Sequence, residues 1–277
     1  MIQTVSKEER DGHFSMGFLS RWRTHKAVSE QGTVDVSERD GVRYLHLGGV
    51  TVQSAMRVNA PYELELAYTR SMMGFLLFRE VPGNILMVGL GGGSVAKFVY
   101  HKLPSARTQV VEINSQVLAA ARSHFFLPEE GPRFRVEIAD GVDSVRARAA
   151  DCDVLMVDGY DDRSLVEGLA SQRFYDDCAG ALTDEGVLVV NLWGSDKLFD
   201  VYLKRIEASF NGHVLSMPTG KMSNIIVFGF KRSPGNPRWR DLKERAKQLE
   251  AEYGLEFSDF VDALRSLNAH SEKRLLV

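Results

Sequence analysis

Five apolar runs of strand length alternate with helix-patterned segments between residues 84 and 193, and this alternation constrains the fold more than any other feature. A strand that alternates with a helix predicts right-handed crossovers and a parallel sheet covered by helices on both faces. The runs are 84-NILMVGL-90, 108-TQVVEI-113, 133-RFRVEI-138, 152-CDVLMVD-158 and 186-GVLVVNLW-193.

Two further runs, 213-HVLSM-217 and 224-NIIVFGF-230, follow a helix-patterned segment. Only residues 218–223 join them, which is too short for a crossover helix, so we expect the two strands to pair antiparallel. A mostly parallel sheet that ends in a reversed hairpin is typical of class I S-adenosylmethionine-dependent transferases. We therefore predict an α/β fold with a Rossmann-like mixed sheet.

The rest of the chain divides into smaller units. Residues 1–25 show no strong period and are expected to form a loosely held arm. Residues 26–60 alternate in polarity around Asp40-Gly41 and Gly48-Gly49, which predicts a small antiparallel β unit. Residues 61–232 then form the nucleoside-binding catalytic domain, with a helix that begins at Pro61. Residues 233–277 are expected to be a charged helical tail that covers a surface or contacts another subunit.

A glycine loop follows the first strand of the sheet. Gly89, Gly91 and Gly93 give the spacing G-x-G-x-G, which is typical of adenosylmethionine sites, whereas Ser94 breaks the dinucleotide fingerprint G-x-G-x-x-G. Such a loop lets the backbone approach a nucleoside ligand closely.

Acidic residues end the next two strands. Glu112 can accept hydrogen bonds from ribose hydroxyls, and Asp140 stands where the adenine amino group is often met in this architecture. The ends of successive parallel strands meet at one edge of the sheet. Together with the glycine loop, these acids therefore predict one nucleoside site.

The fourth strand ends in 157-VDGYDD-162, and here the chain resembles the spermidine synthase (polyamine aminopropyltransferase) family. The family carries D-S-S/T-D at this place, and this chain keeps both acids as Asp158 and Asp161. The resemblance extends over roughly residues 26–232. It also includes Gln53, at the family's distance from Tyr62, and Gln31 in 29-SEQGTVDV-36.

The resemblance implies aminopropyl transfer from decarboxylated S-adenosylmethionine to an amine, with release of methylthioadenosine. It places Gln31, Gln53 and the Asp140-Gly141 pair on the nucleoside, and Tyr62 on the amine. A polyamine is a polycation that needs carboxylates to bind, and its attacking nitrogen must first lose a proton. We therefore assign Asp158 as general base and Asp161 as an anchor for the amine.

The amine half of the site departs from the family pattern. Gly92 stands where the family's glycine motif has an aspartate that holds the aminopropyl amine, and Phe98 replaces a glutamate. Glu63, after Tyr62, stands where the family usually has histidine or glutamine, and we group it with the amine-binding residues. The acceptor amine is therefore not named by the sequence.

Two other functions stay open. The loss of the acid at Gly92 removes one obstacle to intact S-adenosylmethionine, so a methyltransferase on the same fold is the first alternative. A non-catalytic nucleoside-binding or assembly protein is the second.

Composition limits the partners. The 277 residues carry a formal net charge of −3 with no long basic run, so no nucleic-acid footprint is evident. The N-terminus lacks the apolar core of a signal peptide, and no apolar run approaches a membrane span, so we expect a cytoplasmic protein. The scattered histidines and two cysteines predict no metal site. Lys97 and Lys102 are interpreted as solvated helix positions. The family resemblance also suggests a homodimer.

Overall fold

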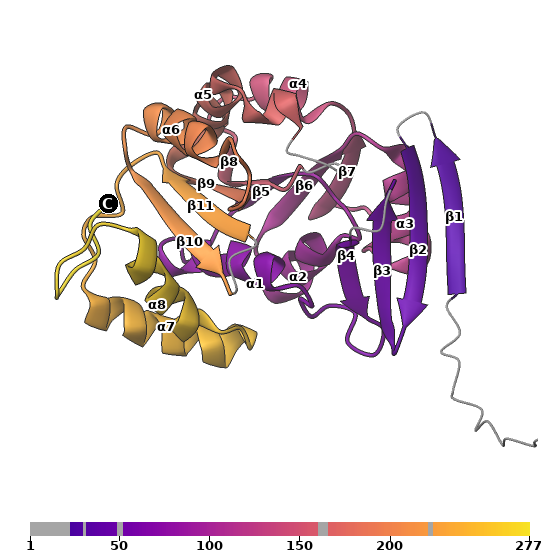
Figure 1. Cartoon of the computed structure of the whole chain (residues 1–277), viewed down its shortest axis with the longest axis horizontal. Helices are drawn as coiled ribbons and strands as arrows, with labels where there is room; N and C mark the ends of the chain where they lie inside the picture. The colour runs from indigo at the N-terminus through magenta and orange to yellow at the C-terminus, as the bar shows by residue number, and fades with distance from the viewer. Residues whose placement is uncertain (1–22, 30–31, 49–51, 160–165, 221–223) are drawn as a thin grey trace, which may run out of the picture.

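The computed structural model describes residues 23–29, 32–48, 52–159, 166–220 and 224–277. They form a large central sheet with helices on both faces and a smaller sheet beside it (Figure 1). Gln31 and Asp161, assigned above to the nucleoside and the amine, lie outside the described residues.

The large sheet has the strand order β10-β11-β9-β8-β5-β6-β7. Strands β5 to β9 run parallel, whereas β11 pairs antiparallel with β9 and β10 pairs antiparallel with β11. This confirms the predicted mixed sheet with a terminal reversed hairpin. The strands are β5 (Asn84–Val88), β6 (Arg107–Glu112), β7 (Phe134–Ile138), β8 (Cys152–Val157), β9 (Leu182–Trp193), β10 (Val214–Thr219) and β11 (Asn224–Phe230).

Side chains alternate between the two faces of this sheet. In β5, Ile85 and Met87 belong to one buried cluster, and Leu86 and Val88 belong to another. The first cluster includes residues of α1 (Ala67–Met72), η1 (Met73–Leu77), α2 (Ser94–Lys102), α3 (Ser115–His124), α7 (Trp239–Tyr253) and α8 (Phe257–Leu267). The second includes residues of α4 (Gly141–Arg146), η2 (Glu167–Ala170), α5 (Gln172–Ala181) and α6 (Phe199–Ser209).

The smaller sheet is antiparallel, with its strands in chain order, and this confirms the predicted β unit. One face of this sheet packs into the same buried cluster as α2 and α3, through Val34, Val36, Leu45 and Met56. The two sheets therefore share a core, with α2 and α3 near the small sheet (Figure 1). The strands are β1 (Arg23–Ser29), β2 (Gly32–Arg39), β3 (Val42–Leu47) and β4 (Val52–Arg57).

Lys97 links the small sheet to the large domain. Its side chain is 1% exposed, so its interpretation as a solvated position is wrong. The Nζ atom donates to the carbonyl of Phe125 at 2.7 Å and lies 3.0 Å from Sδ of Met56. Arg43 of β3 donates to the carbonyl of His124. Both cations thus meet the carbonyl end of α3, where the helix dipole favours positive charge.

The connection from β4 to α1 is a series of turns. The backbone N–H of Ala60 donates to Arg57 and that of Glu63 donates to Ala60, both at 3.1 Å. Leu66 is still extended, so the helix predicted to begin at Pro61 begins six residues later, at Ala67. Pro61 suits a turn as well as a first helical turn, and the spacing of apolar residues alone did not separate the two.

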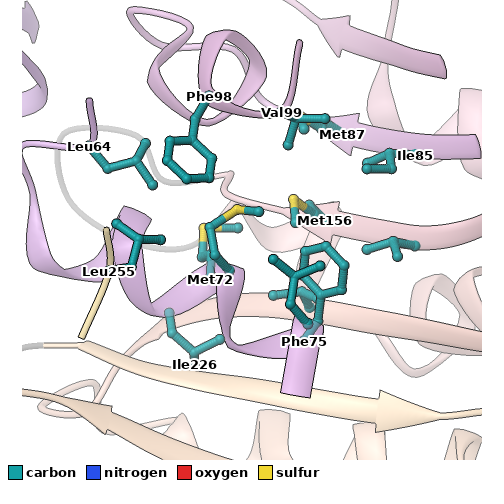
Figure 2. Close-up of a cluster of buried hydrophobic side chains, with 14 of the residues drawn as sticks. Leu64, Met72, Phe75, Ile85, Met87, Phe98, Val99, Met156, Ile226 and Leu255 are labelled. Carbon is teal, nitrogen blue, oxygen red and sulfur yellow. The ribbon is translucent and has the colours of Figure 1, made fainter. Parts of the chain in front are cut away.

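The C-terminal helices pack against η1 and β10, and the segment between them reaches α1. Leu255, between α7 and α8, belongs to the same buried cluster as Met72 of α1 (Figure 2). Arg70 of α1 donates to Glu256 at 2.7 Å. These contacts attach α1 to the C-terminal segment. The position of α1 matters because residues of this helix line the candidate site described below.

Candidate active site

A cavity of about 510 Å³ lies at the carboxyl ends of β5, β6 and β8, between the two sheets. This is the edge at which open α/β sheets bind ligands, and the volume is in the range of small-molecule sites. Of the predicted site residues, Gln53, Gly89, Gly91, Glu112, Asp140, Gly141 and Asp158 all line it.

Gly89 brings the ends of β5 and β8 into contact. Its φ is +96°, and a Cβ atom there would lie 2.2 Å from the carbonyl oxygen of Asp158. The N–H of Asp158 donates to Val88, and that of Gly89 donates to Val111 of β6. Because a side chain fits neither the φ nor the space, glycine is required here for the strands to close on one another.

Gly92 has no room for the aspartate of the family motif. A Cβ atom there would lie 2.9 Å from the ring of Phe125 and 3.1 Å from Cβ of Ser54 in β4. Gly92 is also not among the residues that line the cavity. The small sheet and the end of α3 thus occupy the space that an acid would need.

Glu112 is held at the end of β6 by backbone amides. Its side chain is 7% exposed in the structure, and its oxygens accept from the N–H groups of Leu90 and Asn114 at 2.9 and 2.8 Å. Burial raises the pKa of Glu112, and these backbone hydrogen bonds oppose the rise. The carboxylate therefore ties the glycine loop to the start of α3 while facing the cavity.

Asp140 begins α4. Its Oδ1 accepts from the N–H of Val142 at 2.7 Å, which is an N-cap hydrogen bond. Gly141 packs so closely that a Cβ atom there would lie 2.5 Å from Val88. The cap fixes the carboxyl group at the rim of the cavity, next to the end of β7.

Asp158 is half-buried and joins a chain of side-chain amides. Its Oδ1 accepts from Nδ2 of Asn191 in β9 at 2.8 Å, and Oδ1 of Asn191 accepts from Nδ2 of Asn224 in β11 at 2.8 Å. Burial raises the pKa of Asp158, whereas the hydrogen bonds from Asn191 and Tyr68 lower it. A half-buried carboxylate with a raised pKa is suited to accept a proton.

Tyr68 is a site residue that the sequence reasoning missed. Its hydroxyl donates to the carbonyl of Gln53 at 3.0 Å and also interacts with Asp158. Burial first, and then the charge and hydrogen bonding of Asp158, raise the pKa of Tyr68 well above its ordinary value. Tyr68 and Met72 are four residues apart, so in a helix that begins at Ala67 they lie on the same face. This spacing would have predicted that both side chains face the cavity, as they do.

Tyr62 and Glu63 lie elsewhere. The ring of Tyr62 stacks against His101 with ring centroids 3.8 Å apart, and Glu63 lies 3.7 Å from Nζ of Lys102. Both contacts are at the end of α2, and neither residue lines the cavity. Their assignment to the amine stays a prediction that these contacts do not support.

Two absences hold for the described residues. No group of three or more histidine, cysteine, aspartate or glutamate side chains that could hold a metal ion occurs among them. No helix among them is long and apolar enough to cross a membrane.

Comparison with known proteins identifies relatives of this chain. A polyamine aminopropyltransferase of Chromobacterium violaceum is 41% identical over 257 residues, which are 93% of this chain and 98% of that protein. The fold is similar to a spermidine synthase in complex with the transition-state analogue AdoDATO, with a TM-score of 0.72, 20% identity, and coverage of 88% of this chain and 85% of that one.

Human methyltransferase-like protein 13 in complex with SAH is also similar, with a TM-score of 0.60, 28% identity, and coverage of 75% of this chain and 96% of that one. Residues 65–218 match the spermine/spermidine synthase domain. A domain match over more than half of the chain, together with 41% identity over nearly all of it, shows that the chain belongs to the spermine/spermidine synthase family.

Proposed function

We propose that this protein is an aminopropyltransferase that uses decarboxylated S-adenosylmethionine as cosubstrate and a polyamine or related amine as acceptor. Family membership supports the reaction class. The single observation that carries the chemistry is Asp158, a half-buried carboxylate with a raised pKa that faces the same cavity as the nucleoside-binding elements.

The residues of the cavity fit a thioether nucleoside. Gly89 and Gly91 place the backbone of the glycine loop on the cavity wall, and Glu112 and Asp140 present carboxylates from the next two strands. The nucleoside would therefore lie across the ends of β5, β6 and β7. This leaves the end of β8, with Asp158, for the reacting groups.

Asp158 acts in this proposal as general base. The acceptor amine enters as an ammonium ion and gives one proton to the carboxylate. Its nitrogen lone pair then forms a bond to the propyl carbon next to the sulfonium, and the carbon–sulfur bond breaks with its electron pair going to sulfur. Methylthioadenosine leaves as a neutral thioether, and the new secondary amine carries the positive charge.

Tyr68 supports the base in two ways. Its hydroxyl can donate to the ionised carboxylate of Asp158, or it can donate to Gln53 and accept from the protonated carboxyl group. Both states of Asp158 thus have a partner. Asp161 is kept in the proposal as the second acid for the amine, and Gln31 as a nucleoside contact. We also propose a cytoplasmic homodimer, as the family resemblance suggests.

A methyltransferase is the second candidate, because human methyltransferase-like protein 13, in complex with SAH, shares the fold at 28% identity. The absence of an acid at Gly92 fits a cosubstrate that keeps its own carboxylate. The purified protein with each cosubstrate and a panel of diamines tests both. Methylthioadenosine as product supports aminopropyl transfer, whereas S-adenosylhomocysteine alone supports methyl transfer.

If neither product forms, but methylthioadenosine still raises the melting temperature Tm, the protein binds nucleosides without catalysis. This outcome would favour the assembly role over both enzymes.

A further inference from the structure

Asn191 and Asn224 form an ordered pair of amides behind Asp158. Asn191 is 3% exposed, and it lies in β9 opposite the reversed strand β11. The register pairs Asn224 with Trp193, two residues along β9 from Asn191, so both amides lie on the same face of the sheet. The reversed hairpin therefore places the side chain of Asn224 next to Asn191 in β9, the strand whose amide donates to Asp158.

The direction of the two hydrogen bonds fixes one orientation of Asn191. An amide side chain has a donor end and an acceptor end, and an ionised carboxylate only accepts. Asn224 donates to the carbonyl oxygen of Asn191 at 2.8 Å, which leaves the N–H₂ end to face Asp158, also at 2.8 Å. A flipped amide would place two oxygens in contact unless Asp158 carried a proton.

The other groups around Asp158 come from three elements. Tyr68 reaches it from α1, and its phenol is the titratable group in contact with the carboxylate among the described residues. Glu112 and Asp140 line the same cavity from the ends of β6 and β7. The amide of Asn191 and the phenol of Tyr68 are both neutral donors that favour the ionised form, and the amide is the donor that comes from the sheet itself.

We propose that Asn191, held in one orientation by Asn224, is a positioning residue that keeps the carboxylate of Asp158 ionised and facing the cavity. The inference rests on the proposed role of Asp158 as base, which it deepens. Asn191 acts through Asp158 and contacts neither substrate in this account.

The test is a direct titration of Asp158 by carbon NMR of the full-length protein with labelled aspartate, in which the Asp158 carboxyl signal is identified by its loss in Asp158→Asn. Asn191→Leu keeps the side-chain size and removes the donor. We expect it to raise the pKa of Asp158 by about one unit or more, the size expected for a hydrogen bond to a charged group. Asn224→Ala removes the donor that orients the Asn191 amide, and it should raise the pKa of Asp158 by less than Asn191→Leu does.

Asn268→Ala is the matched control. The Asn268 amide makes two hydrogen bonds of 2.8 Å with the backbone of Ser216 in β10, outside the cavity. We expect this variant to lower Tm without changing the titration of Asp158. The proposal is overturned if both Asn191→Leu and Asn224→Ala leave the Asp158 pKa at its wild-type value, or if Asn268→Ala shifts it as much.

This readout does not depend on turnover. If the wild-type protein releases no methylthioadenosine, the proposed function fails, while the titration still decides whether Asn191 sets the state of Asp158. If turnover occurs, the low-pH limb of kcat/KM should move upward in Asn191→Leu and recover at high pH. An equal loss of kcat/KM at every pH would indicate a structural role instead and would contradict the proposal.

Discussion

The hydroxyl of Tyr68 donates to the backbone carbonyl of Gln53 over 3.0 Å, which ties the first turn of α1 to β4 across the cavity. The same hydroxyl interacts with Asp158. The tyrosine therefore joins the small sheet, the helix and the acid at the end of β8, and its position follows from the late start of α1.

Tyr68→Phe tests this tyrosine. The variant removes a hydrogen bond to a charged group, so we expect kcat/KM for aminopropyl transfer to fall roughly tenfold to a hundredfold. Tyr62→Phe is the control, because Tyr62 is 40% exposed and its ring stacks on His101. A large loss in Tyr62→Phe with none in Tyr68→Phe would restore the assignment from the family resemblance.

Gly89→Ala should prevent the strand ends from closing. We expect a lower Tm and loss of the Tm increase caused by methylthioadenosine, because the new Cβ atom would meet the carbonyl of Asp158 at 2.2 Å. Gly41→Ala is the control, since Gly41 has φ of +75° but no atom within 4 Å of the added Cβ. We expect Gly41→Ala to lose about 1–3 kcal/mol of stability through backbone strain and to bind the nucleoside as the wild type does. Equal effects in the two variants would contradict the close approach.

Asp158→Asn should stabilise the protein. Burial raises the pKa of Asp158 in the folded state, so the free energy of unfolding falls as the pH rises from the ordinary pKa through the raised one, and the loss is complete above it. We expect a higher Tm than wild type at pH 8, with a gain that shrinks as the pH falls through the raised pKa toward the ordinary value of about 3.9.

Asp153→Asn is the opposite case. Burial would raise the pKa of Asp153, but the N–H groups of Asn84 and Gly83 and the charge of Arg79 outweigh it and hold the pKa below its ordinary value. We expect this variant to lower Tm at neutral pH, because ionised Asp153 stabilises the fold. If Asp158→Asn lowered Tm by a similar amount, ionised Asp158 would stabilise the fold, and this would contradict the prediction above.

Lys97→Met tests the buried cation. Burial first, and then the charge of Arg43, lower the pKa of Lys97 to about 7, below the ordinary value of about 10.4. Between these values the unfolded chain binds more protons, so the free energy of unfolding of the wild type should rise with pH relative to that of Lys97→Met. Denaturant unfolding at pH 7, 8 and 9 measures this. Lys102→Met, which removes a partly exposed lysine of the same helix, is the matched control.

Much of the site could be predicted from sequence because it lies on consecutive strand ends. Gly89, Glu112, Asp140 and Asp158 each stand at the end of a strand or within two residues of it, and parallel strands bring such positions to one edge. Tyr68 could not be placed in this way. The family resemblance selected Tyr62 by its distance from Gln53. The tyrosine that lines the cavity is set by where α1 begins, and only the turns after Arg57 show that position.

Two other features depend on contacts between distant segments. Lys97 has the pattern of a surface position, and its burial arises because β4 and the end of α3 close over it. The pairing of Asn191 with Asn224 depends on the register of the reversed hairpin, which apolar runs do not specify.

Asp158 is proposed as the base of an aminopropyl transfer. The most direct measurement is methylthioadenosine release from decarboxylated S-adenosylmethionine and a diamine, for wild type and Asp158→Asn at equal nucleoside occupancy. We predict release by the wild type and a loss of about a hundredfold to ten-thousandfold in the variant, with nucleoside affinity nearly unchanged. Full activity of Asp158→Asn would contradict the assignment of the base, and no release by the wild type with any diamine would contradict the proposed reaction.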